Sequence, residues 1–148
     1  MIGNSGGKDS ATVLAMAVKA LGADKVLAVE MPCLSNPKDL EDAKMVAETF
    51  GVRSIQVDLS NPYQELEDKI QTQLEQKLNT ESKVNMKPRL RMMTLYSIAQ
   101  TLGYLVIGTG NLCEAMVGYT TKWGDNSSDF NPIGNFTVSE VLEIGEYL

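Results

Sequence analysis

The chain has 148 residues, 43% hydrophobic and 22% charged, which is typical of one globular domain with a core of its own. Its formal net charge of −6, from 13 basic and 19 acidic side chains, argues against a nucleic-acid partner. A local basic cluster (Lys87, Arg89 and Arg91) is the one feature that points the other way. With no histidine and only two cysteines, Cys33 and Cys113, the sequence excludes a Ser-His-Asp triad and the usual zinc sites.

We expect both cysteines to be reduced, which predicts a cytoplasmic protein. The longest apolar stretches are too short to span a membrane, and we find no signal-peptide pattern, so no membrane partner is expected. Any catalysis has to rely on positioning and charge, with carboxylates or lysines as the proton carriers.

The most informative stretch comes first along the chain, at residues 3–10 (Gly-Asn-Ser-Gly-Gly-Lys-Asp-Ser). Ile2 can end a strand, and residues 11–21 are apolar almost all round, which predicts a helix buried against a sheet. A turn rich in Gly and Ser at this junction presents backbone N–H groups at a helix N-terminus, which favours binding of a phosphate. The spacing fits neither a Walker A loop nor the G-x-G-x-x-G dinucleotide fingerprint. An ordinary Gly-rich turn is the alternative.

The rest of the chain alternates predicted strands and helices. Strands are expected at residues 25–31, 53–59 and 104–108, helices at 37–50, 62–78 and 88–102, and loops at 79–87 and 109–135. A last helix should follow Thr137, because Thr-Val-Ser-Glu has the spacing of a capping box. This order predicts an α/β fold, a doubly wound parallel sheet with helices on both faces. In such a sheet, ligands bind beyond the carboxyl ends of the strands.

A second group of motifs lies between residues 85 and 134. It comprises Asn-Met-Lys-Pro-Arg-Leu-Arg-Met at 85–92, Gly-Tyr-Leu-Val-Ile-Gly-Thr-Gly-Asn at 103–111, Glu114, Val-Gly-Tyr-Thr-Thr-Lys-Trp-Gly-Asp at 117–125, and Asp-Phe-Asn-Pro-Ile-Gly at 129–134. The loop at 5–10 resembles the PP-loop of the ATP pyrophosphatases, which split ATP into AMP and pyrophosphate. With the later motifs in this order, the chain from Gly3 onward resembles the ammonia-dependent NAD synthetase family.

The resemblance implies a carbon–nitrogen ligase that amidates deamido-NAD (nicotinic acid adenine dinucleotide) with ammonia and ATP. The products would be NAD, AMP and pyrophosphate, formed through an acyl-adenylate. It implies that ATP is bound by Gly3, Asn4, Ser5, Gly6, Gly7, Lys8, Asp9, Ser10 and Thr109. It also implies that Asp9 and Glu114 hold Mg²⁺, that Arg89, Lys122 and Asp129 contact deamido-NAD, and that Asp125 takes a proton from ammonium.

The chemistry of these side chains suits the roles that the resemblance implies. Mg²⁺ prefers carboxylate and phosphate oxygens, and a guanidinium forms paired hydrogen bonds with phosphate or carboxylate. Each residue alone has a simpler explanation; Asp9, for example, could merely cap the helix that follows it. Only their joint spacing favours a site.

Two features depart from the family pattern. Val138 follows Thr137 where the family has a lysine that contacts ATP. The chain is also expected to be a single domain, residues 1–148, that is truncated at both ends. The resemblance further implies a homodimer. The alternatives are another PP-loop ligase, such as one like GMP synthetase, and a truncated, non-catalytic nucleotide-binding or dimerisation module.

Overall fold

A parallel three-stranded sheet in the order β1-β2-β3 lies at the centre of the computed structural model, which describes residues 1–148. The strands are β1 (Ile2–Gly3), β2 (Leu27–Glu30) and β3 (Arg53–Gln56). All four residues of β2 are buried, as expected for a strand covered on both faces. The strands predicted at Ile2, 25–31 and 53–59 are therefore confirmed, with shorter bounds.

The strand expected at 104–108 is reduced to a single ladder position. Ile107 forms a parallel bridge with Ile2 on one side and with Phe130 on the other. Gly108 N donates to Phe130 O at 2.8 Å, and Asp129 N donates to Val106 O at 2.9 Å. Two short extended segments thus continue the sheet beyond β1. The second of them lies within the stretch expected to be a loop.

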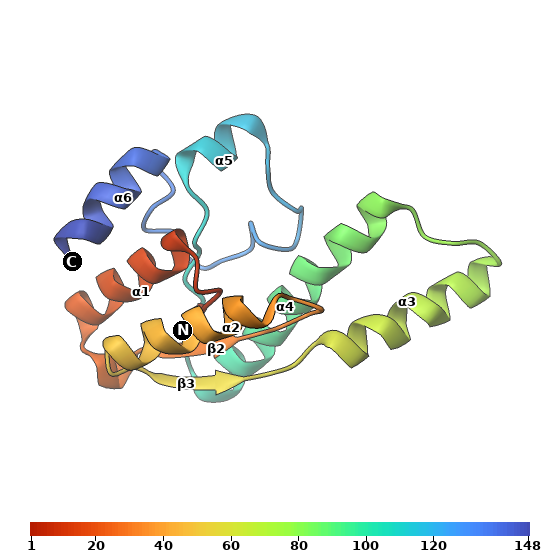
Figure 1. Cartoon of the computed structure of the whole chain (residues 1–148), viewed down its shortest axis with the longest axis horizontal. Helices are drawn as coiled ribbons and strands as arrows, with labels where there is room; N and C mark the ends of the chain where they lie inside the picture. Colours follow the sequence, from red (N-terminus) through yellow and green to blue (C-terminus); the bar gives the residue numbers. More distant parts are fainter.

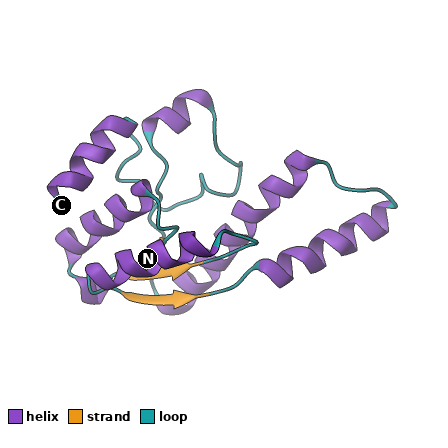
Figure 2. Cartoon of the chain, in the orientation of Figure 1, coloured by secondary structure: helices purple, strands orange, loops and turns teal.

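Seven helical segments connect and cover these strands. They are α1 (Lys8–Leu21), the 3₁₀ turn η1 (Ala23–Lys25), α2 (Pro37–Thr49), α3 (Ser60–Leu74), α4 (Thr80–Leu102), α5 (Leu112–Val117) and α6 (Val138–Tyr147). Figure 1 shows α3 and the first turns of α4 extending together away from the sheet, while α5 and α6 lie near the start of α1. Figure 2 shows that most of the remaining chain is loop, concentrated around α5.

The core is divided between the two faces of the sheet because alternate side chains of β2 point in opposite directions. Ala28 belongs to a cluster with residues of α1, α2 and α6, including Val13, Ala47 and Val141. Leu27 and Val29 belong to a second cluster with α3 and α4. Helices on both faces confirm the doubly wound α/β class.

The prediction of a loop at 79–87 is wrong, because these residues include the first turns of α4. Asn79 caps this helix: its Oδ1 accepts a hydrogen bond from Ser82 N at 2.8 Å. Lys83 forms an ion pair with Glu67 of α3 at 2.6 Å. Pro88, expected at the start of a helix, lies inside α4 instead. The stretch lacks a clear apolar period because it packs mainly against α3 rather than against the sheet.

The stretch expected to be a loop at 109–135 also contains a helix, α5. Asn111 and Glu114 form a capping box, in which Glu114 N donates to Asn111 Oδ1 at 3.1 Å and Asn111 N donates to Glu114 Oε2 at 2.9 Å. The capping box expected at Thr137 is confirmed, with Thr137 N donating to Glu140 Oε2 at 2.7 Å. No helix combines the length and the apolar composition that a membrane crossing requires.

Candidate active site

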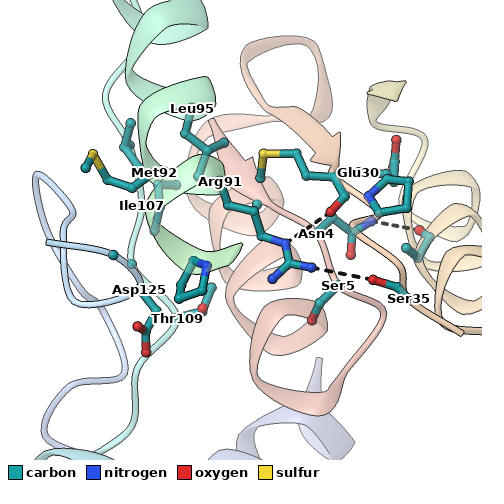
Figure 3. Close-up of a pocket in the computed structure, with 18 of the residues that line it drawn as sticks. Asn4, Ser5, Glu30, Ser35, Arg91, Met92, Leu95, Ile107, Thr109 and Asp125 are labelled. Atoms are coloured by element: carbon teal, nitrogen blue, oxygen red, sulfur yellow. Dashed lines mark hydrogen bonds between the residues drawn. The ribbon is translucent and has the colours of Figure 1, made fainter. Parts of the chain in front are cut away.

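Two adjoining cavities open at the carboxyl edge of the sheet. The larger cavity, of about 330 Å³, lies between the ends of β1 and β2, the start of α2, and α4 (Figure 3). The smaller cavity, of about 210 Å³, lies against the loop after β1 and is lined by no hydrophobic residue. Both cavities are lined by Ser5, Thr109 and Asp125. A ligand with an apolar part and a strongly polar part can therefore span the two.

Asn4 ties the loop at residues 3–10 to its surroundings. It is 4% exposed, and its Nδ2 donates to Ala43 O of α2 at 2.7 Å. Its Oδ1 accepts from Gly6 N at 3.3 Å, and its own N donates to Val29 O at 2.9 Å. The loop is thus held between β2 and α2 by one buried side chain.

Two serines shape the interior of the same loop. Ser10 Oγ donates to Gly7 O at 3.0 Å and lies 3.0 Å from Ser5 Oγ, which accepts from Gly7 N at 3.3 Å. No side chain caps α1 at its N-cap, Gly7. The N–H groups of the first turn of α1 are therefore available to an anion, as expected where a loop cradles phosphates.

Two carboxylates, Asp9 and Glu114, line the smaller cavity. Buried Asn111 lies between them: its Nδ2 is 3.5 Å from Asp9 Oδ1, and its backbone N donates to Glu114 Oε2 at 2.9 Å. The second Asp9 oxygen, Oδ2, accepts from Lys8 Nζ at 2.7 Å. The structure therefore brings together Asp9 and Glu114, which are 105 positions apart in the sequence.

These two carboxylates suit Mg²⁺ only if a bound ligand supplies further oxygen atoms. No group of three or more acidic, Cys or His side chains is arranged to hold a metal ion. Mg²⁺ is usually bound by one or two protein carboxylates together with water and substrate phosphates, and the pair here fits that pattern. Asp9 already has one cationic neighbour, the Lys8 ammonium, at 2.7 Å.

Asp125, at the boundary of the two cavities, is held by one of its carboxylate oxygens. Its Oδ1 accepts from Thr121 N at 2.7 Å, while Oδ2 has no hydrogen-bond partner in the chain. The Thr121 hydroxyl in turn donates to Asn85 Oδ1 of α4 at 2.7 Å. The turn that carries Asp125 is therefore fixed to α4, with one carboxylate oxygen left for a ligand.

The three residues implied to contact deamido-NAD line neither cavity. Arg89 Nε donates to the backbone O of Lys122 at 3.2 Å, so these two residues are neighbours. Asp129 lies elsewhere: its Oδ2 accepts from Val106 N at 2.7 Å, and its Oδ1 lies 3.4 Å from the Tyr96 hydroxyl. Asp129 holds the extended segment in place, and the structure does not group it with Arg89. Val138, the departure from the family pattern, is the first residue of α6 and lines neither cavity.

Three charged residues of the larger cavity had no role assigned from the sequence: Arg91, Glu30 and Asp39. Arg91 reaches from α4 to the segment after β2, where its Nε donates to Met31 O at 3.1 Å and its Nη2 lies 3.5 Å from Ser35 Oγ (Figure 3). A signal for it was present, since Arg91 is the second arginine of the Arg-Leu-Arg motif. Glu30 had no signal, because one acid within an apolar strand reads as an exposed position.

Glu30 is a buried carboxylic acid with an unsatisfied oxygen. The residue is 2% exposed, and its Oε1 has no hydrogen-bond partner. Burial raises the pKa of Glu30, and Asn4, Lys44 and Ser54 offset that effect only in part. The raised pKa means that the folded state disfavours the ionised form.

Replacing Glu30 by Gln is expected to stabilise the protein at neutral pH. Below the unfolded pKa of 4.5 the side chain is neutral in both states, so ionisation costs nothing there. As the pH rises, the unfolded chain ionises first, and wild type loses stability until the folded pKa is passed. Glu30→Gln should raise the free energy of unfolding at pH 7.5 by about 1.4 kcal/mol for each unit by which folding raises the pKa of Glu30, because the amide cannot ionise. Urea unfolding at pH 4 and 7.5 measures this, with exposed Glu48→Gln as the control. A variant that is no more stable than wild type at pH 7.5 would contradict the assignment.

The parallel sheet, helices on both faces and a Gly/Ser loop at the carboxyl edge define a Rossmann-like α/β domain. A family model for NAD synthase matches residues 1–148, and the chain belongs to that family. It is 47% identical to the NH(3)-dependent NAD(+) synthetase of Carboxydothermus hydrogenoformans over 148 residues, which cover 100% of this chain and 60% of that protein.

Solved structures agree with this membership. The NMN synthetase from Francisella tularensis superposes with a TM-score of 0.90 at 35% identity, covering 99% of this chain and 59% of that one. The NH3-dependent NAD synthetase from Campylobacter jejuni, in complex with the nitrate ion, gives a TM-score of 0.86 at 35% identity, covering 99% and 62%. The chain thus spans about three-fifths of the length of these relatives.

Proposed function

We propose that the chain catalyses the ATP-dependent amidation of deamido-NAD by ammonia, giving NAD, AMP and pyrophosphate. Family membership supports the reaction, and the pairing of the two cavities supports its geometry. The larger, partly apolar cavity suits the base and ribose of ATP, and the smaller one suits its phosphates. The α-phosphate then lies near Ser5, Thr109 and Asp125, which the two cavities share.

The chain's own groups suit the first step, attack of a nicotinate carboxylate oxygen on the α-phosphorus. As the new P–O bond forms, the bond to pyrophosphate breaks and negative charge builds up on the leaving group. The free N–H groups of the first turn of α1 are placed to stabilise this charge, and the Lys8 ammonium lies beside them, on Asp9 Oδ2 at 2.7 Å. Asp9 and Glu114 would hold Mg²⁺, which supplies further neutralisation of the phosphate charge.

In the second step ammonia attacks the acyl carbon, the C–O bond to AMP breaks, and the amide forms. Ammonium has to lose a proton before it can attack. Asp125 Oδ2, at the boundary of the cavities and without a partner, is our proposed acceptor for that proton.

The contacts with the dinucleotide are proposed outside the cavities. Arg89 and Lys122 adjoin Pro88 and the turn at Gly124, which line the larger cavity, so a dinucleotide leaving the cavity would meet both. Asp129 would contact the dinucleotide while its carboxylate keeps its hydrogen bonds with Val106 and Tyr96. The homodimeric state and the cytoplasmic location stay predictions. A second candidate acceptor is nicotinate mononucleotide, because the Francisella tularensis relative is an NMN synthetase.

Product analysis tests the proposal. The purified chain is given ATP, Mg²⁺ and ammonium with deamido-NAD, nicotinate mononucleotide or xanthosine monophosphate. We expect NAD, AMP and pyrophosphate in equal amounts from deamido-NAD, and no ADP. Turnover only with the mononucleotide would favour the second candidate, and turnover only with xanthosine monophosphate would favour a ligase like GMP synthetase. Calorimetric binding of ATP and deamido-NAD without turnover would identify a non-catalytic module.

A further inference from the structure

Arg91 is the only basic side chain that lines either cavity. The other charged residues there are acidic: Glu30, Asp39 and Asp125 in the larger cavity, and Asp9, Glu114 and Asp125 in the smaller. A nucleotide that enters this site brings several negative charges of its own. The site therefore requires positive charge, and on the wall of the larger cavity only Arg91 provides it.

Arg91 forms no ion pair that would account for its charge. The two ion pairs in the structure are Lys8–Asp9 and Lys83–Glu67. Arg91 is half-buried, so its guanidinium keeps only part of its hydration and has no carboxylate to compensate. Its surroundings therefore suit an anion.

The guanidinium is held in place with donors to spare. An arginine side chain has five N–H donors, and Arg91 uses one on Met31 O at 3.1 Å and one, at the limit of 3.5 Å, on Ser35 Oγ. These partners fix the plane of the guanidinium across the larger cavity (Figure 3). The remaining donors form a rigid fork suited to phosphate oxygens.

We propose that Arg91 binds the α-phosphate of the nucleotide. The phosphate lies where the two cavities meet, so the fork would hold it in ATP, in the acyl-adenylate and in AMP. This inference rests on the proposed nucleotide site but not on the amidation reaction. A guanidinium in this position would also stabilise the charge that develops at the α-phosphorus during attack.

The test compares ligands that differ only in phosphate. Adenosine, AMP and ATP are titrated calorimetrically into wild type and Arg91→Met. A charge-assisted hydrogen bond contributes about 1.5–3 kcal/mol, so the affinity for AMP and ATP should fall about 10- to 100-fold, while that for adenosine stays within about twofold. Arg91→Lys, which keeps the charge but loses the fork, should fall between the two.

Lys87→Met is the matched control. Lys87 lies one turn before Arg91 on α4 and carries the same charge, but it lines neither cavity and its Nζ lies 5.5 Å from the Tyr63 ring centroid. It should bind all three ligands like wild type. An equal loss of adenosine and AMP affinity in Arg91→Met would show that Arg91 only braces the segment after β2 and would overturn the proposal, as would unchanged AMP affinity. Wild type that binds AMP but makes no NAD would count against the proposed reaction and leave this inference standing.

Discussion

Replacing Asp9 by Asn is expected to lower the rate of pyrophosphate release at least about 100-fold and to leave the fold intact. Changes to groups that merely support a metal ligand already cost 10- to 100-fold, so loss of the ligand's own charge should cost more. Asn has the same shape and can still accept from Asn111. The only ion pair lost is the partly exposed one with Lys8, which contributes at most about 1 kcal/mol. The rate is measured at saturating ATP over a range of Mg²⁺ concentrations, and unfolding is followed in parallel.

Two outcomes of the Asp9 experiment would contradict its assignment. One is an unchanged rate at every Mg²⁺ concentration. The other is a loss of rate that matches a loss of folded protein, which would make Asp9 a structural residue. Asp68→Asn, at an exposed position on α3, controls for the removal of one negative charge and should behave like wild type.

Replacing Gly6 by Ala is expected to destabilise the protein by about 2–5 kcal/mol and to abolish ATP binding. Gly6 has a φ of +76°, which costs an L-residue roughly 1–2 kcal/mol. A Cβ there would also lie 2.7 Å from Ala43 N and 2.8 Å from Asp39 O, both backbone atoms of α2. Overpacking of this kind costs about 1–3 kcal/mol more. The loop would have to move away from α2, and this movement would disrupt the backbone arrangement that binds phosphate.

The chain offers two matched controls for Gly6. At Gly7, φ is −78° and a Cβ would meet only Ser5 Oγ at 3.4 Å, so Gly7→Ala should fold like wild type. At Gly118, φ is +68° but no atom lies within 4 Å, so Gly118→Ala should show the backbone cost alone, about 1–2 kcal/mol. If Gly6→Ala were no less stable than Gly118→Ala, close packing against α2 would not explain the glycine.

The parts of the fold that the sequence predicts well are those with a strong local signal. The βαβ unit from Ile2 to Glu30 combines apolar strands with a helix that is apolar almost all round, and the capping box at Thr137 marks the last helix. The beginning of α4 could not be predicted because it packs on α3 and leaves Val84 59% exposed, so it has no apolar stripe. The extended segment at Phe130 depends on pairing with Ile107, a contact that no local pattern encodes.

The residues of the candidate site likewise fall into those that the sequence predicts and those that it does not. The loop at residues 3–10 and the stretch after Gly108 are predicted to meet, because both follow strand ends and strand ends lie at one edge of the sheet. The position of Arg91 depends on how α4 crosses the end of β2, which is a tertiary property. The Asp129 carboxylate accepts hydrogen bonds from Val106 and Tyr96, and the spacing of motifs carries no information about such bonds.

The central claim is that a nicotinate carboxylate is activated on the α-phosphorus of ATP, and isotope transfer tests it most directly. Deamido-NAD labelled with ¹⁸O in both carboxylate oxygens is incubated with the chain, ATP, Mg²⁺ and ammonium, and the products are analysed by mass spectrometry. The proposed mechanism predicts one ¹⁸O atom in the phosphoryl group of each AMP and none in pyrophosphate. AMP without label, or label in pyrophosphate, would contradict it.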